Sequence, residues 1–141
     1  MYRPAAGLTA RPLRRIASGG EVSRVMLACK VVLGEADGTE TLVFDEVDAG
    51  VGGATAVSLA QVLARLAKSH QVIVVTHLAQ VAVMAEKHYL VSKEGEELPE
   101  TTIEPIEGDA RVREIARMLS GDQTQASLEH AREMLASARG Q

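Results

Sequence analysis

Residues 41–77 read TLVFDEVDAGVGGATAVSLAQVLARLAKSHQVIVVTH, and this stretch decides the fold. Residues 41–44 and 72–75 are short runs that are apolar on both faces, which is typical of central strands in a parallel sheet. Between them, residues 54–67 place leucine and valine at helical spacing. A strand, a helix and a second strand within this length form a βαβ unit, whose strands are parallel and whose crossover is right-handed. The sequence therefore predicts an α/β fold in which helices flank a parallel sheet.

Further elements are expected on both sides of this unit. Residues 20–33 carry apolar side chains around most of a helix, so we expect this helix to be mostly buried. Asp109 is expected to cap a helix that stops at Gly121. The remaining expected elements are a short helix over 78–86, an antiparallel hairpin formed by 88–93 and 101–106, and a last helix over 124–138.

Composition limits the classes of function. The chain has 141 residues, enough for about one domain, and its aromatic content of 2% argues against stacking on single-stranded nucleic acid. The net charge is −4, yet residues 1–30 hold six basic residues and one acidic residue. This front of the chain either binds an anion, phosphate or nucleic acid, or is simply a solvated arginine edge, which is the interpretation that charge alone favours. The single cysteine, Cys29, indicates a reduced compartment, and we find no run long enough to span a membrane. We therefore expect a cytoplasmic protein with no membrane partner.

Three polar side chains are expected together at the carboxyl edge of the sheet, where open parallel sheets bind ligands. Asp45 and Glu46 follow the first strand, and His77 follows the second. In nucleotide hydrolysis, Asp45 would hold magnesium, Glu46 would polarise the attacking water, and the His77 imidazole could touch the terminal phosphate. Alternatively, Asp45 caps a turn, Glu46 points into solvent and His77 is an ordinary hydrogen-bonded residue.

Ser18, Gly19, Gly20 and Glu21 stand at a predicted helix start, where backbone N–H groups and the helix dipole favour an anion. The same four residues also form a capping box, which needs no ligand. Asp48 belongs to a glycine-rich loop that is either a flexible turn or a place where another backbone comes close. The Walker A pattern G-x-x-x-x-G-K-[ST] does not occur in this sequence.

Taken in order, these residues resemble the second half of an ABC-type ATPase head. Ser18 to Glu21 match the signature motif, residues 42–46 match Walker B with its glutamate, Asp48 matches the D-loop, and His77 matches the H-loop. Four segments closely resemble the RecN family of bacterial DNA repair proteins, which are relatives of the SMC family. They are IASGGEVSRVMLA, TLVFDEVDAGVGG, VIVVTHLAQVA and REIARMLSG. The sequence departs from the pattern at two positions. Ala17 stands where most ABC-type proteins have leucine, and Ala79 stands where the RecN family often has proline.

The resemblance implies one domain over 1–141 that is the C-terminal part of an ATPase head. Within it, 1–12 would be an irregular entry segment, 13–92 would run from the signature to the H-loop, and 93–141 would hold the hairpin and the C-terminal helices. The missing phosphate loop would lie on an N-terminal head segment that also bears a coiled coil. This chain alone is then expected to be inactive.

In that family pattern, Asp45 supports Mg²⁺, Glu46 activates water, and His77 contacts the γ-phosphate of ATP. Ser18, Gly19, Gly20 and Glu21 would reach the ATP held by a second head, and Asp48 would line the same interface. The complete protein would hydrolyse ATP to ADP and phosphate as an ATP-dependent homodimer. It would act on DNA in the repair of double-strand breaks and in recombination, near the bacterial nucleoid.

Two other functions remain open from the sequence. The chain could be the nucleotide-binding part of an ABC transporter, which would adjoin membrane subunits. It could also be a non-catalytic module that only dimerises heads. Candidates for DNA contacts are Arg3, Arg11, Arg14 and Arg15.

Overall fold

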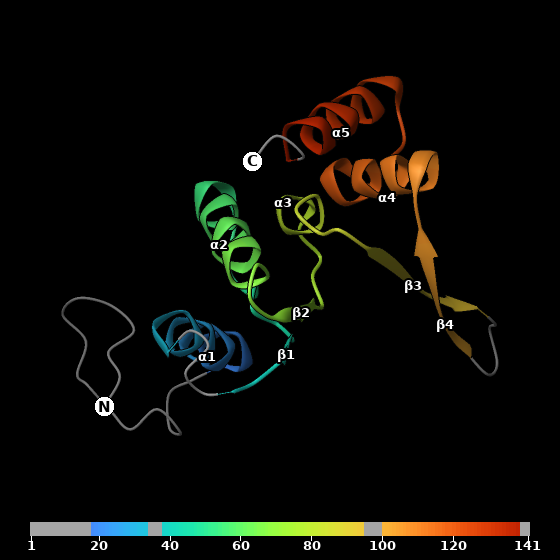
Figure 1. Cartoon of the computed structure of the whole chain (residues 1–141). Helices are drawn as coiled ribbons and strands as arrows, with labels where there is room; N and C mark the ends of the chain where they lie inside the picture. Colours follow the sequence, from blue (N-terminus) through green and yellow to red (C-terminus); the bar gives the residue numbers. More distant parts are fainter. Residues whose placement is uncertain (1–17, 34–37, 95–99, 139–141) are drawn as a thin grey trace. The chain divides into compact units, whose positions relative to one another are not determined.

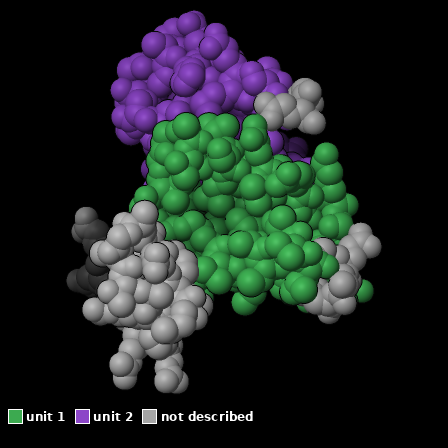
Figure 2. All heavy atoms as spheres, turned by 90° about the vertical axis from the view of Figure 1, so that its left-hand side faces the viewer, with its two compact units in different colours: residues 1–76 green, residues 77–141 purple. Residues whose placement is uncertain are grey.

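The computed structural model describes residues 18–33, 38–94 and 100–138 (Figure 1). The four arginines proposed for DNA contacts lie outside these residues. Contacts between residues divide the chain into two compact units, residues 1–76 and 77–141, which Figure 2 colours separately. None of the described helices is both long and apolar enough to cross a membrane.

The first unit contains the predicted βαβ arrangement. In chain order it consists of α1 (Gly19–Leu33), β1 (Thr41–Phe44), α2 (Gly53–Leu66) and β2 (Gln71–Val74). β1 and β2 are parallel neighbours, and Phe44 pairs with Val74 at the end of the ladder. The α/β class, the parallel sheet and the connecting helix are therefore confirmed.

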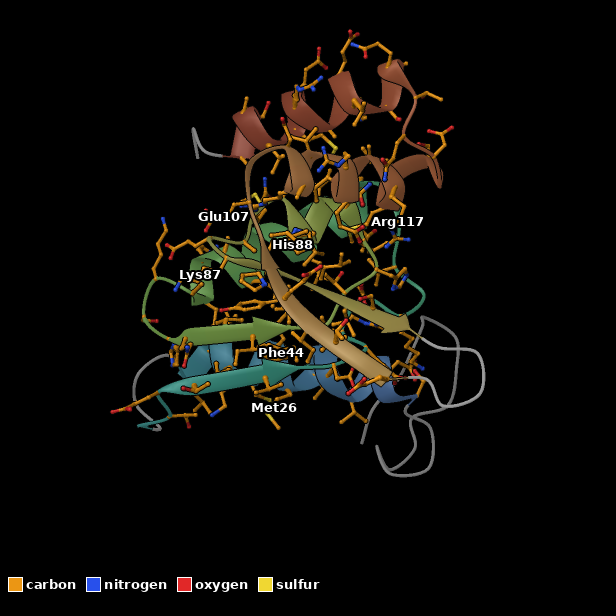
Figure 3. The ribbon with its side chains drawn as sticks, turned by 90° about the vertical axis from the view of Figure 1, so that its right-hand side faces the viewer. Met26, Phe44, Lys87, His88, Glu107 and Arg117 are labelled. Atoms are coloured by element: carbon orange, nitrogen blue, oxygen red, sulfur yellow. The ribbon has the colours of Figure 1, made fainter. Side chains whose placement is uncertain are left out.

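The core of the first unit lies on one face of this pair of strands. Phe44, labelled in Figure 3, is buried together with Leu42 on the same face of β1. Val43 points to the other face and is 66% exposed. On the same side, Ile73 in β2 and Val75 just after that strand are 47% and 57% exposed. The sequence predicts central strands of a parallel sheet, whereas among the described residues β1 and β2 pair only with each other and the buried apolar residues of the first unit gather on one side. These residues are Leu27, Leu42, Phe44, Val47, Ala56, Leu59, Ala60, Leu63 and Leu66.

α1 also differs from its prediction. Within the helix only Gly20 and Leu27 are buried. Met26, labelled in Figure 3, is 51% exposed, and Val32 is 84% exposed. An all-round apolar pattern predicts burial only where partners surround the helix. α1 contacts α2, and this contact leaves most of its apolar surface open.

The second unit consists of a hairpin and a small helical cluster. Its elements are α3 (Ala79–Ala82), β3 (His88–Glu94), β4 (Glu100–Ile106), α4 (Gly108–Ser120) and α5 (Gln125–Ala138). β3 and β4 pair antiparallel, so the expected hairpin is confirmed. α3 is shorter than predicted, and the carbonyl groups at and after its end accept hydrogen bonds from the Arg111 guanidinium. The buried cluster joins α3, α4 and α5 through Ala79, Ala82, Val83, Ile115, Ala116, Ala131 and Leu135.

The ends of α4 test two further expectations. Gly121 has a φ of 76° and its N–H donates to the Arg117 carbonyl over 2.8 Å, so the predicted glycine stop is confirmed. The predicted cap at Asp109 is wrong, because the helix already begins at Gly108, one residue before Asp109. Glu107 occupies the cap position and makes no side-chain hydrogen bond to the helix. Asp109 instead lies in the first turn, where the helix dipole stabilises its negative charge.

Candidate functional site

Two carboxylates leave β1 at the carboxyl edge of the parallel pair. Because Phe44 pairs with Val74, the segments that follow β1 and β2 start from one edge. Asp45 and Glu46 come directly after Phe44, and both are exposed. The expected position of this pair is confirmed, while the roles of the two side chains stay predictions. We call residues 45–51 the edge loop.

Glu46 adopts an unusual backbone conformation in the edge loop. Its φ of 56° is the single positive value at a non-glycine position among the described residues. The left-handed region costs such a residue about 1 kcal/mol, so surrounding contacts must hold it there. One of them is local, because the Ala49 N–H donates to the Glu46 carbonyl over 2.9 Å. The turn therefore fixes the direction in which the Glu46 side chain leaves the strand.

The predicted capping box is present at the start of α1. The Glu21 N–H donates to Ser18 Oγ over 3.3 Å, and the Ser18 N–H donates to Glu21 Oε2 over 3.0 Å. These reciprocal bonds satisfy backbone donors of the first turn. The capping function of Ser18 and Glu21 is thus confirmed, and both side chains remain at the surface for a further role.

The start of α1 is fastened to the edge loop by two side chains, Ser23 and Arg24, that were not predicted from the sequence. Ser23 Oγ donates to the Asp45 carbonyl over 2.6 Å. Arg24 Nη1 donates to the carbonyl groups of Val47 and Ala49 over 3.1 and 2.8 Å. Because the acceptors are main-chain groups, no residue type in the loop could have indicated these bonds. They place Ser18 to Glu21 beside the edge loop of the same chain.

Gly19 and Gly20 allow this close approach. A Cβ atom at Gly20 would lie 2.7 Å from the Glu46 carbonyl oxygen and 2.8 Å from Ala49 Cβ. At Gly19, a Cβ would overlap the Glu46 carboxylate. Both distances at Gly20 are shorter than any ordinary carbon contact and involve atoms that cannot move without the backbone, so packing requires a glycine at this position. At Gly19 the overlap is with the end of a flexible side chain, which could move aside. The Glu46 carboxylate accordingly rests against the first residue of α1.

Asp48 and Thr76 join the two segments that leave the strands. Asp48 is 2% exposed, and Thr76 Oγ1 donates to its Oδ2 over 2.5 Å. Thr76 is the first residue beyond the ladder, which ends with the Val75 N–H donating to the Phe44 carbonyl. His77 follows Thr76, opens the second unit and is exposed.

Asp45 at the edge meets the requirement for one carboxylate ligand to nucleotide-bound magnesium. In the part of the chain that the structure describes, no three His, Cys, Asp or Glu side chains are grouped to hold a metal ion. Asp45 offers one exposed carboxylate, and Mg²⁺ commonly binds through one or two carboxylates, several waters and substrate phosphates. Asp45 therefore fits a single ligand to an ion that a nucleotide brings.

Comparison with known proteins adds the family. No family model matches the chain. The DNA repair protein RecN of Deinococcus radiodurans is 57% identical over 126 residues, which are 89% of this chain and 22% of that protein. The RecN proteins of Streptomyces coelicolor and Mycobacterium leprae are 49% and 52% identical over 99% and 94% of the chain. The chain belongs to the RecN family.

This RecN-family chain spans about a quarter of the length of the relatives it matches, between 22% and 25% in these three. A solved structure from work on ATP-driven dimerization and DNA-stimulated activation of SMC ATPases aligns with 95% of the chain and 68% of its own length. That alignment has a TM-score of 0.49 and 17% identity.

Proposed function

We propose that this chain is the C-terminal part of an ATPase head that acts in the repair of DNA double-strand breaks and in recombination. The observation that carries the proposal is the fastening of the Ser18–Glu21 turn to the edge loop. A candidate anion seat and a candidate catalytic carboxylate pair are thereby held together, at the edge where parallel sheets bind ligands. The similarity to RecN proteins supports a head of a DNA repair protein over the nucleotide-binding part of a transporter.

Each side chain at the edge has a role in this proposal. Asp45 accepts Mg²⁺, which would neutralise charge on the phosphates of ATP. Glu46, whose direction the turn fixes, orients and deprotonates the attacking water. His77 contacts the γ-phosphate through its ring. These three act on ATP held by a Walker A loop on a separate N-terminal head segment.

The start of α1 serves a second head. Ser18, Gly19, Gly20 and Glu21 present the N-terminus of α1, a fifteen-residue helix, to the ATP of a partner head in a homodimer. Asp48 belongs to the loop that would line this interface. Hydrolysis would separate the heads, and contact with DNA would take place through the full-length protein.

The open apolar face of the sheet supports a partner segment. Val43, Ile73 and Val75 are each at least 47% exposed on one side of β1 and β2. Strands that are apolar on both faces belong to sheets covered on both faces. We assign this open face to the N-terminal head segment that carries the Walker A loop and the coiled coil.

A substitution at Glu46 tests the proposal against a non-catalytic dimerisation module. In a head reconstituted with the Walker A segment, Glu46→Gln should slow phosphate release by at least about 100-fold while ATP and the dimer are retained, because only the general base is lost. Glu40→Gln is the matched control, since Glu40 is an exposed carboxylate before the other end of β1. Normal hydrolysis by the Glu46 variant would exclude this residue as the base, and no hydrolysis by the unaltered head would favour the dimerisation module.

A further inference from the structure

The buried carboxylate of Asp48 has a role that differs from contact with a second head. We propose that Asp48 is a positioning residue, which holds the chain just before His77 against the loop that carries Glu46. The proposal rests on the proposed function in one respect, namely that Glu46 and His77 serve the same ATP.

Burial is the first reason for this assignment. A carboxylate that reached a partner head would need access, whereas Asp48 is 2% exposed within a single chain. Burying a carboxylate is costly unless hydrogen bonds satisfy it. Thr76 Oγ1 supplies such a bond, across 28 positions of sequence. The interaction is therefore part of the fold of the first unit.

The position of the bond is the second reason. Thr76 lies directly after the last ladder bond and directly before His77. Asp48 lies two residues after Glu46, between the two carbonyl groups that Arg24 holds. A bond at this point fixes the two segments that follow β1 and β2 relative to each other. Small shifts of catalytic groups are expensive, since a misplacement of about 1 Å can cost about 100-fold in rate.

The chain offers substitutions that separate the bond from the charge. Asp48→Asn keeps an oxygen that accepts from Thr76, and Thr76→Ser keeps the hydroxyl. Asp48→Ala and Thr76→Val each remove one partner. In the reconstituted head, we expect the last two variants to lower kcat about tenfold with KM for ATP within about twofold of the unaltered head, because positioning acts on the chemical step. The first two variants should stay within about threefold.

The double variant Asp48→Ala with Thr76→Val should be no slower than the slower single variant by more than about twofold, because both changes remove one shared interaction. The assignment is overturned if Asp48→Asn is as slow as Asp48→Ala while Thr76→Val is normal. That pattern would mean that the carboxylate acts through its charge, as at an interface with a second head.

Hydrogen exchange of the chain by itself keeps the assignment testable if reconstitution fails. Thr76→Val should speed amide exchange in peptides covering residues 44–52 and 72–79 together, and Thr76→Ser should not. Thr41→Val is the matched control, since it removes the Thr41 to Gln71 side-chain bond at the opposite end of the same strands. Unchanged amide exchange of both peptides in Thr76→Val would refute the proposed link between the segments that follow β1 and β2. Absence of turnover in the unaltered head would instead count against the proposed function.

Discussion

At the scale of single residues, His88 on β3 ties the stability of the second unit to pH. Its Nδ1 is buried and finds no hydrogen-bond partner within the described residues. Burial lowers the pKa of His88 from its usual 6.5, the positive charge of Arg111 lowers it further, and Glu114 opposes the shift. Figure 3 labels this ring on its strand. The folded chain therefore favours neutral His88 more strongly than the unfolded chain does.

The sign of the resulting pH dependence follows from proton uptake. Below pH 6.5, the ordinary pKa of histidine, the unfolded chain binds the proton more readily than the folded chain. The stability that neutral His88 provides is thus present above this pH and is lost as the pH falls toward the lower folded pKa. Urea unfolding measured from about pH 7.5 to about pH 5.5 should show a falling midpoint.

His88→Gln should flatten that fall, and the control His130→Gln should not, because the His130 side chain is 61% exposed. A His88→Gln variant with the same pH dependence as the unaltered chain would show that another group titrates.

At the scale of elements, the close approach between the start of α1 and the edge loop predicts which glycine matters for stability. A methyl group at Gly20 meets main-chain and Cβ atoms of the loop, which cannot move aside without shifting the backbone. Gly20→Ala should therefore lower the free energy of unfolding by about 1–3 kcal/mol, the usual cost of overpacking. Urea unfolding with intrinsic circular dichroism measures this value.

Gly52→Ala is the control for that prediction, since a Cβ at Gly52 meets nothing within 4 Å and its φ of −164° suits any residue. We expect it to cost less than about 1 kcal/mol through the weaker helix cap. Equal stability of the two variants would mean that α1 is not docked on the loop.

The elements also show what could be predicted from the sequence and what could not. β1, β2, α2 and the hairpin were predictable, because each has a local period or apolar run that only one kind of element explains. The open face of α1 was not, since an all-round apolar pattern gives no information on which partners cover it. The capping box at Ser18 and Glu21 was predictable from its spacing.

The hydrogen bonds that hold the site together could not be predicted from the sequence, because no local pattern records them. Ser23 and Arg24 bind main-chain carbonyl groups, and every residue of the loop has such a group. Thr76 binds Asp48 across a distance in sequence that no local pattern records. Asp45, Glu46 and Asp48 were therefore predictable as candidates from the sequence, but the inward direction of the Asp48 side chain was not.

At the scale of the whole molecule, the proposed ATPase head needs residues from two segments. The sequence lacks a Walker A lysine, the chain spans about a quarter of the length of its RecN relatives, and one sheet face of the first unit is open. These observations support the proposal that the phosphate loop of the head comes from another segment. Neither part should then hydrolyse ATP by itself.

The need for two segments is tested by phosphate release from ATP, measured for the chain alone, for the Walker A segment alone and for their equimolar mixture. We expect turnover in the mixture and only background in each part, with Glu46→Gln returning the mixture to near background. Turnover by the isolated chain at the rate of the mixture would contradict the need for two segments.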